Sequence, residues 1–182
     1  MATDHITFGT GSVVSVAQVT VAVDLSTPTA PVDSTILVRR TGVFDTVRIT
    51  AADLRAAQRK RSRIHAEFEE GGDASSRVDV LLDVVVHIAS DARTARSEVR
   101  WQPSTTDTAG DDTVVYVGTP SGLASLILDI RSAEVADGVT VVPAIAEGES
   151  RDACVQLLMG EVLTMLETRN LTSDATVRQH AS

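Results

Sequence analysis

His87 and two aspartates of the same segment carry side chains that could do chemistry. An imidazole near the end of a long apolar segment could act as a general acid or base, although His87 between Val86 and Ile88 could equally be a packed or surface residue. Asp79 and Asp83 are four residues apart, so a strand would place both carboxylates on one side. Paired carboxylates can perform acid–base work, but strand spacing alone does not establish such a pair.

Cys154 is the only cysteine, and it has no obvious histidine partner. It lies beside Val155 and Leu158 on the apolar stripe of a predicted helix, which favours a buried structural thiol over a nucleophile. A single cysteine excludes an intrachain disulfide, which fits a reducing compartment. The remaining histidines give no spacing typical of zinc ligands, so we predict no metal site; they are His5, His65 and His180.

Two segments could bind an anion, and a third could dock a partner. The first anion-binding candidate is the segment of Arg39, Arg40, Thr41 and Gly42, which follows a short predicted strand. It could be a phosphate site or a solvated basic turn. The second, Gly118-Thr119-Pro120, could present helix N–H groups to an anion or could only cap the helix. The third, the basic helix face over residues 55–63, could equally be solvated.

The elements that position these residues follow from hydrophobic periodicity and capping signals. The predicted strands cover residues 12–25, 35–38, 45–49, 78–88 and 139–142. The predicted helices start at Thr50, at Ser90 or Asp91, at Thr119 and at Ser150. Strands that alternate with helices favour right-handed parallel β-α units, so we predict an α/β fold. We expect one domain over residues 1–171 and a disordered tail over residues 172–182.

Charge and composition limit the partners. The net charge of −9 argues against non-specific nucleic-acid binding, which needs a basic face. The N-terminus lacks a basic region and a leucine-rich segment, which argues against a signal peptide, and no apolar run approaches the length of a membrane span. We therefore expect a cytoplasmic protein with no nucleic acid and no membrane among its partners.

Six motifs within about residues 26–171 resemble, in the same order along the chain, the C-terminal half of the luciferase-like flavin monooxygenases, in particular the nitrilotriacetate-monooxygenase branch. Three of them resemble the family's proline-rich entry to strand five (26–31), its strand six (45–54) and its strand seven with an Ala/Arg-rich helix (80–96). The other three resemble its Gly-Thr-Pro helix start (116–120), its strand eight (137–143) and its terminal helix (162–171). The family fold is a TIM barrel, which typically takes about 250 residues. The resemblance therefore implies a partial, half-barrel sheet with helices, preceded by a valine-rich strand.

The resemblance also implies an activity and a cofactor. Family members oxidise organic substrates with reduced flavin and oxygen, so it implies an FMN-dependent monooxygenase acting on a small organic molecule. Arg39, Arg40, Thr41 and Gly42 stand where family members hold the flavin phosphate in a Gly/Ser-rich loop, which makes them the candidate FMN-binding residues. The catalytic residues stay unassigned, because much of the family's active site belongs to the first half of the barrel.

Two classes of function therefore remain. The first is a flavin-dependent oxidoreductase, and the second is a non-catalytic, degenerate half-barrel that serves as a binding or oligomerisation module. A half-barrel leaves strand edges and apolar surface that need covering. We expect a homodimer or a partner chain to cover them, unless residues 12–25 fold back over one edge.

Overall fold

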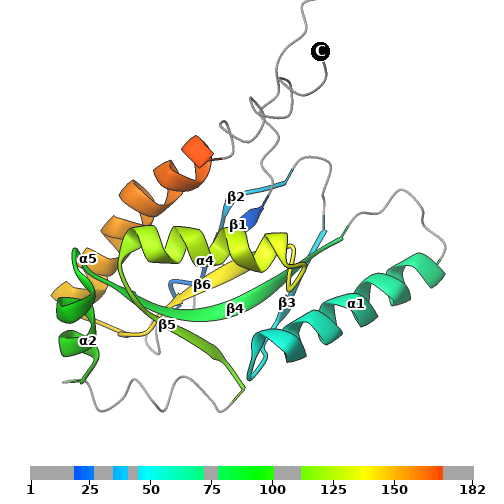
Figure 1. Cartoon of the computed structure of the whole chain (residues 1–182), viewed down its shortest axis with the longest axis horizontal. Coiled ribbons are helices and arrows are strands. Elements are labelled where there is room, and N and C mark those ends of the chain that lie inside the picture. Colours follow the sequence, from blue (N-terminus) through cyan, green and yellow to red (C-terminus); the bar gives the residue numbers. More distant parts are fainter. Residues whose placement is uncertain (1–18, 27–34, 41–44, 72–77, 101–111, 170–182) are drawn as a thin grey trace, which may run out of the picture.

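The structure, a computed structural model, describes residues 19–26, 35–40, 45–71, 78–100 and 112–169. Strands from these residues form one six-stranded sheet, and helices pack against it (Figure 1). The predicted tail, the first part of the predicted strand 12–25, and both Thr41 and Gly42 lie outside the described residues.

The sheet is built around its longest strand, β4 (Val78–Ile88). One edge of β4 pairs with β6 (Gly138–Pro143), whereas the other pairs with β3 (Asp45–Ile49) along its first half and with β5 (Val114–Gly118) along its second half. All three pairings are parallel. Ten of the eleven residues of β4 are buried, as expected for a strand rich in valine and leucine that is covered on both faces.

The other end of the sheet differs from a simple succession of parallel strands. β1 (Thr20–Val23) pairs in parallel with β6, and β2 (Thr35–Val38) pairs antiparallel with β1 at the edge of the sheet. β2 therefore does not lie beside β3, although the two strands are close in sequence. The predicted α/β half-barrel is present, with a mixed rather than wholly parallel sheet.

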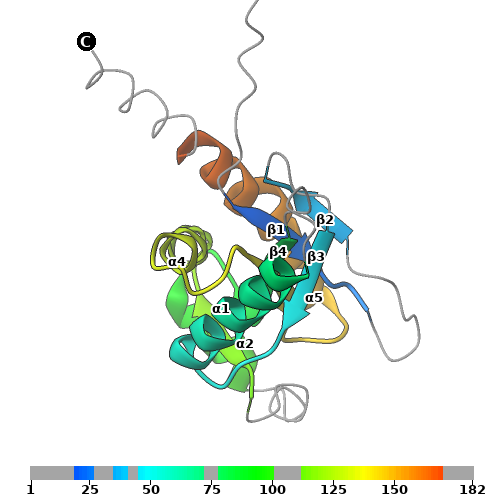
Figure 2. The same cartoon turned by 90° about the vertical axis from the view of Figure 1, so that its right-hand side faces the viewer.

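Four helical segments share one core with the sheet. They are α1 (Leu54–Glu70), α4 (Pro120–Ser132), α5 (Glu149–Leu157) and the π-helical η1 (Leu158–Val162). Their buried side chains meet every second residue of β4, including Leu82, Val84 and Val86. Figure 2 shows α1 and α4 on the same side of the sheet.

The alternate residues of β4 lie on the opposite face, because successive strand side chains point to opposite sides. We call this surface the Asp83 face. It contains the odd-numbered β4 residues from Asp79 to His87 and their partners in register, which include Arg48 on β3, Val117 on β5 and Thr140 on β6.

Two local predictions need correction. The predicted cap Thr50 does not cap α1; the carboxylate of Asp53 accepts the Ala56 N–H at 2.6 Å instead. Residues 114–118, which are not among the predicted strands, form strand β5. Three valines around a tyrosine suit a strand, and α4 then starts at the Thr119-Pro120 signal.

Candidate functional site

His87 lies at the carboxyl end of β4, the side of a parallel sheet where ligands usually bind. The imidazole is fully buried, and its Nε2 lies 2.6 Å from a carboxylate oxygen of Glu98 on α2 (Ala92–Arg100). Its Nδ1 is also buried and has no hydrogen-bond partner among the residues that the structure describes. The sequence placed this imidazole near a strand end, but it gave no sign of the glutamate eleven residues later.

Asp83 belongs to a charge network that crosses the Asp83 face. Arg48 donates to both carboxylate oxygens of Asp83, at 3.0 and 2.8 Å, and to Asp24 just after β1 at 2.7 Å. These hydrogen bonds outweigh burial and raise the pKa of Arg48. Burial raises the pKa of Asp24, but hydrogen bonds from Ser26 and Arg48 more than offset it and leave that pKa below its usual range.

Asp79 shares a face with Asp83 as predicted, but the two carboxylates do not form a pair. The fully buried Asp79 accepts hydrogen bonds from the Thr20 hydroxyl and from Arg40 Nη2, the latter at 2.5 Å. Each aspartate thus has its own arginine, one near the start of β4 and one near its middle. This arrangement neutralises buried charge and does not create a shared-proton dyad.

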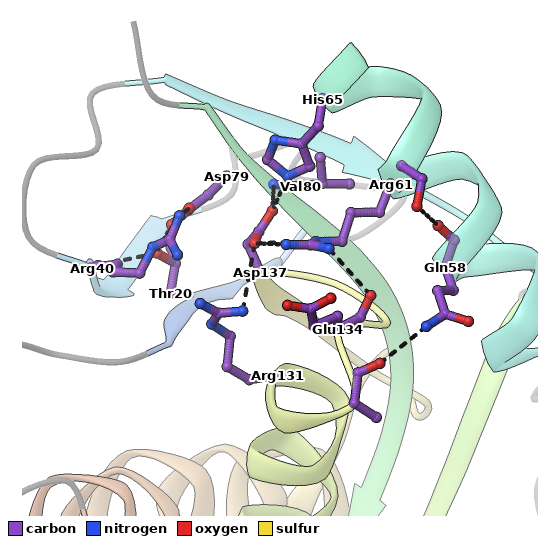
Figure 3. Close-up of polar contacts among 12 residues, drawn as sticks. Thr20, Arg40, Gln58, Arg61, His65, Asp79, Val80, Arg131, Glu134 and Asp137 are labelled. Atoms are coloured by element: carbon purple, nitrogen blue, oxygen red, sulfur yellow. Dashed lines mark hydrogen bonds and ion pairs between the residues drawn. The ribbon is translucent and has the colours of Figure 1, made fainter. Parts of the chain in front are cut away.

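The predicted phosphate-binding residues occupy an unexpected end of the sheet. Because β2 runs antiparallel to β1, Arg39 and Arg40 lie beside the amino ends of the parallel strands rather than their carboxyl ends. Figure 3 shows Arg40 directed at Asp79 and Thr20, and its backbone N–H donates to the Thr20 hydroxyl at 3.1 Å. Binding of a flavin phosphate by these two residues with Thr41 and Gly42 stays a prediction.

A larger cluster at the same amino-end side surrounds Asp137, which directly precedes β6 (Figure 3). This fully buried carboxylate accepts hydrogen bonds from Arg61 at 2.9 Å and from the Val80 N–H at 3.1 Å, and it lies 2.6 Å from His65 Nε2. Burial raises the pKa of Asp137, but the hydrogen bonds from Arg61, Val80 and His65 more than offset it and hold that pKa below its usual range.

The Asp137 cluster was missed by sequence reasoning. The one available signal was that Arg61 and His65 are four residues apart on a helix and so share a face. The cluster joins α1, β4 and β6 at the amino ends of the strands, a side that contributes stability in such folds.

Cys154 is buried, as predicted. Its Sγ lies 4.0 Å from the Val86 carbonyl oxygen, and burial raises the pKa of the thiol. The side chain belongs to the core on the α4 and α5 side of β4, the face opposite His87. The thiol is therefore structural, and His87 does not serve as its base.

Gly118-Thr119-Pro120 caps α4. The Thr119 hydroxyl accepts the Gly122 N–H at 3.3 Å, and the Tyr116 hydroxyl donates to the Thr119 carbonyl at 3.2 Å. A methyl group at Gly122 would lie 2.1 Å from the tyrosine oxygen, so the glycine makes room for this ring. The motif's contacts are explained by capping and by packing of Tyr116.

The basic face of α1 divides into separate contacts. Arg61 binds Asp137, Lys60 donates to the Thr50 carbonyl at 2.6 Å, and Arg63 pairs with Glu67 at 3.5 Å. Arg55 and Arg59 are exposed. The predicted docking surface is thus reduced to a few exposed side chains.

Comparison with known proteins shows a likeness of fold. No protein-family model matches the sequence, and no curated protein matches it significantly. Solved structures do match, among them EDTA monooxygenase (EmoA) from Chelativorans sp. BNC1, with a TM-score of 0.55 at 15% identity, and riboflavin lyase (RcaE) with modified FMN and substrate riboflavin, with a TM-score of 0.55 at 16% identity. Long-chain alkane monooxygenase (LadA) matches with a TM-score of 0.52 at 12% identity.

The matches cover much of this chain and a smaller part of the others. They span 69–70% of this chain but only 37–40% of those three proteins. The neighbours are luciferase-like flavin monooxygenases, and the likeness confirms the predicted resemblance to part of their barrel.

No helix among the described residues is long and apolar enough to cross a membrane.

Proposed function

We propose that this chain acts in flavin-dependent oxidoreduction as one half of a luciferase-like barrel. The observation that carries the proposal is the fold: a half-barrel that matches flavin monooxygenases over 69–70% of its own length. We propose FMN as the flavin and a small organic molecule as the substrate, in keeping with the neighbours' chemistry.

The described residues fit only part of an FMN molecule. The carboxyl half of the Asp83 face carries valines that suit an apolar ring, among them the half-buried Val117 and Val142, which flank the buried Val85. A phosphate needs cations or backbone N–H groups. Arg48 is paired with two aspartates, and Arg40 is paired with Asp79 at the amino ends of the strands, so neither of these two arginines is available for a flavin phosphate. We assign no catalytic step to the described residues.

The proposal consequently requires further elements to complete the pocket. Within the described residues, β2, β3 and β5 each pair with only one other strand, so the sheet has open edges. We propose that a second copy of the chain covers them, which would bring additional carboxyl-end residues to the same pocket.

Titration of the purified protein with oxidised and then reduced FMN, followed by calorimetry, tests the proposal. Saturable binding at micromolar affinity is expected, and riboflavin serves as the matched ligand without phosphate. Arg39→Ala should weaken FMN more than riboflavin if the predicted phosphate site is used, with Arg55→Ala on the exposed side of α1 as control. Absence of binding up to millimolar FMN would refute the flavin function.

The second candidate, a non-catalytic binding or oligomerisation module, is favoured by one observation. The acidic and basic side chains of the Asp83 face neutralise one another, as a structural surface would require. Self-association without any flavin binding in the same titration would support this alternative.

A further inference from the structure

The carboxyl end of β4 contains a hydrogen-bonding group that the flavin proposal does not use. His87 is 0% exposed, and its Nε2 lies within hydrogen-bond distance of Glu98, whereas its Nδ1 has no hydrogen-bond partner in the described part of the chain. Leaving a buried polar atom unpaired costs free energy, because the hydrogen bond that it made to water is lost and not replaced. Native structures rarely accept that cost without a ligand, a bound water or a catalytic role at the site.

The pairing with Glu98 decides which nitrogen of His87 is available. The Glu98 side chain is 34% exposed, so solvent reaches the carboxylate. An ionised carboxylate can only accept hydrogen bonds, so Nε2 must carry a proton. In the neutral imidazole, Nδ1 then presents a lone pair that can accept a hydrogen bond.

The strand residues beside His87 limit the chemistry of a partner. On the Asp83 face His87 follows Val85 along β4, and Val117 of β5 lies directly beside it. An anion would be repelled by Glu98, and a cation would lose its hydration among valines. These surroundings favour an uncharged, largely apolar molecule with one N–H or O–H donor.

We propose that His87 and Glu98 form a binding site for such a neutral donor, with Nδ1 as the acceptor of its hydrogen bond. Glu98 is the positioning residue, because it fixes the tautomer and the ring. The site lies where ligands of parallel sheets bind, and it requires no flavin, so it can be tested whether or not the flavin function holds.

Nitrogen NMR of histidine-labelled protein tests this proposal. A long-range ¹H–¹⁵N spectrum at neutral pH, assigned through the signal that disappears in His87→Gln, should show a protonated Nε2 and an unprotonated Nδ1. Addition of phenol or benzamide should shift the Nδ1 signal saturably, whereas toluene, which has a similar ring and no donor, should leave it unchanged. A spectrum with a protonated Nδ1 and an unprotonated Nε2 would overturn the proposal. An Nδ1 signal that neither phenol nor benzamide shifts would also overturn it, because that result is expected if a trapped water occupies the site.

A matched pair of variants separates the role of Glu98 from a general effect of charge. Glu98→Gln should mix the two neutral tautomers of His87 and weaken the phenol response, while Glu161→Gln on the exposed side of η1 should change neither. An unchanged tautomer in Glu98→Gln would remove the positioning role. A phenol response without FMN binding would support this site and count against the flavin function, and FMN binding without a phenol response would do the reverse.

Discussion

Asp137 shows at the scale of one residue how this fold handles buried charge. Its carboxylate is 0% exposed and is satisfied by Arg61, His65 and the Val80 N–H. Removing one partner of such a buried group leaves the other charges unpaired in the interior. The resulting loss of stability is larger than the stability that the intact cluster adds compared with apolar side chains in its place. The cluster is therefore a point where single substitutions matter.

We expect Asp137→Asn to lower the free energy of unfolding by about 3 kcal/mol, because Arg61 and His65 lose their common anion. Urea unfolding followed by circular dichroism measures this change. Glu67→Gln is the control: its pair with Arg63 is exposed, so the expected change is within about 0.5 kcal/mol. Equal effects of the two substitutions would contradict the assignment.

Acid should destabilise the fold through the same carboxylate. The pKa of Asp137 lies below its unfolded value of about 3.9, so its stabilisation is complete above that pH and is lost as pH falls through the folded pKa. Asp24, whose pKa is also lowered, adds to the loss in the same pH range. Urea midpoints measured from pH 7 down to about pH 3 should fall steeply below about pH 4 and less steeply in Asp137→Asn. Identical pH profiles for both proteins would disprove this linkage.

At the scale of elements, the approach of β1 to β6 depends on Gly138. This residue pairs with Thr20 on one side and Leu81 on the other. A methyl group there would lie 1.9 Å from the Thr20 carbonyl oxygen and 2.8 Å from Leu81 Cδ2. Because the oxygen belongs to the backbone, the strands would have to separate.

Gly138→Ala should therefore lower the free energy of unfolding by more than about 2 kcal/mol. Gly160→Ala provides the matched control, because no described residue beyond its own stretch of helix has an atom within 4 Å of the added methyl group, and η1 would gain helix propensity. We expect that variant to be more stable by roughly 0.5–1 kcal/mol. Thermal melting of both variants and of the original protein measures these changes in stability. A Gly138→Ala protein as stable as the original would show that β1 packs less tightly against β6 than described.

At the scale of the whole molecule, the open sheet edges are where we propose that a second copy binds. On β5, Val115 is 52% exposed, an unusual position for a valine on a strand edge of this sheet. If a second copy covers this edge, a charge there should oppose pairing.

We expect Val115→Lys to shift the protein from dimer to monomer in light scattering at micromolar concentration. Met159→Lys is the control, because Met159 is similarly exposed at 45% but lies on η1 rather than on the sheet. A monomeric original protein would refute the dimer, and equal loss of association in both variants would place the interface elsewhere.

The sequence by itself determined the features that depend on neighbouring residues. The long run from Val78 to Ile88 specified a doubly covered strand, Thr119-Pro120 specified a helix start, and alternating strands and helices specified the α/β class. The position of His87 near a strand end and the burial of Cys154 followed from the same patterns. Periodicity and capping are local properties, so no knowledge of distant residues was needed.

Only the tertiary structure decided which distant residues meet. β2 lies beside β1 and not beside β3, which moved Arg40 to the amino ends of the strands and gave it Asp79 as partner. Asp137 meets Arg61 across 76 residues, and His87 meets Glu98 through the placement of α2. Strand pairing and ion pairing are set by the packing of the complete sheet and its helices, and that information is not contained in any local stretch of sequence.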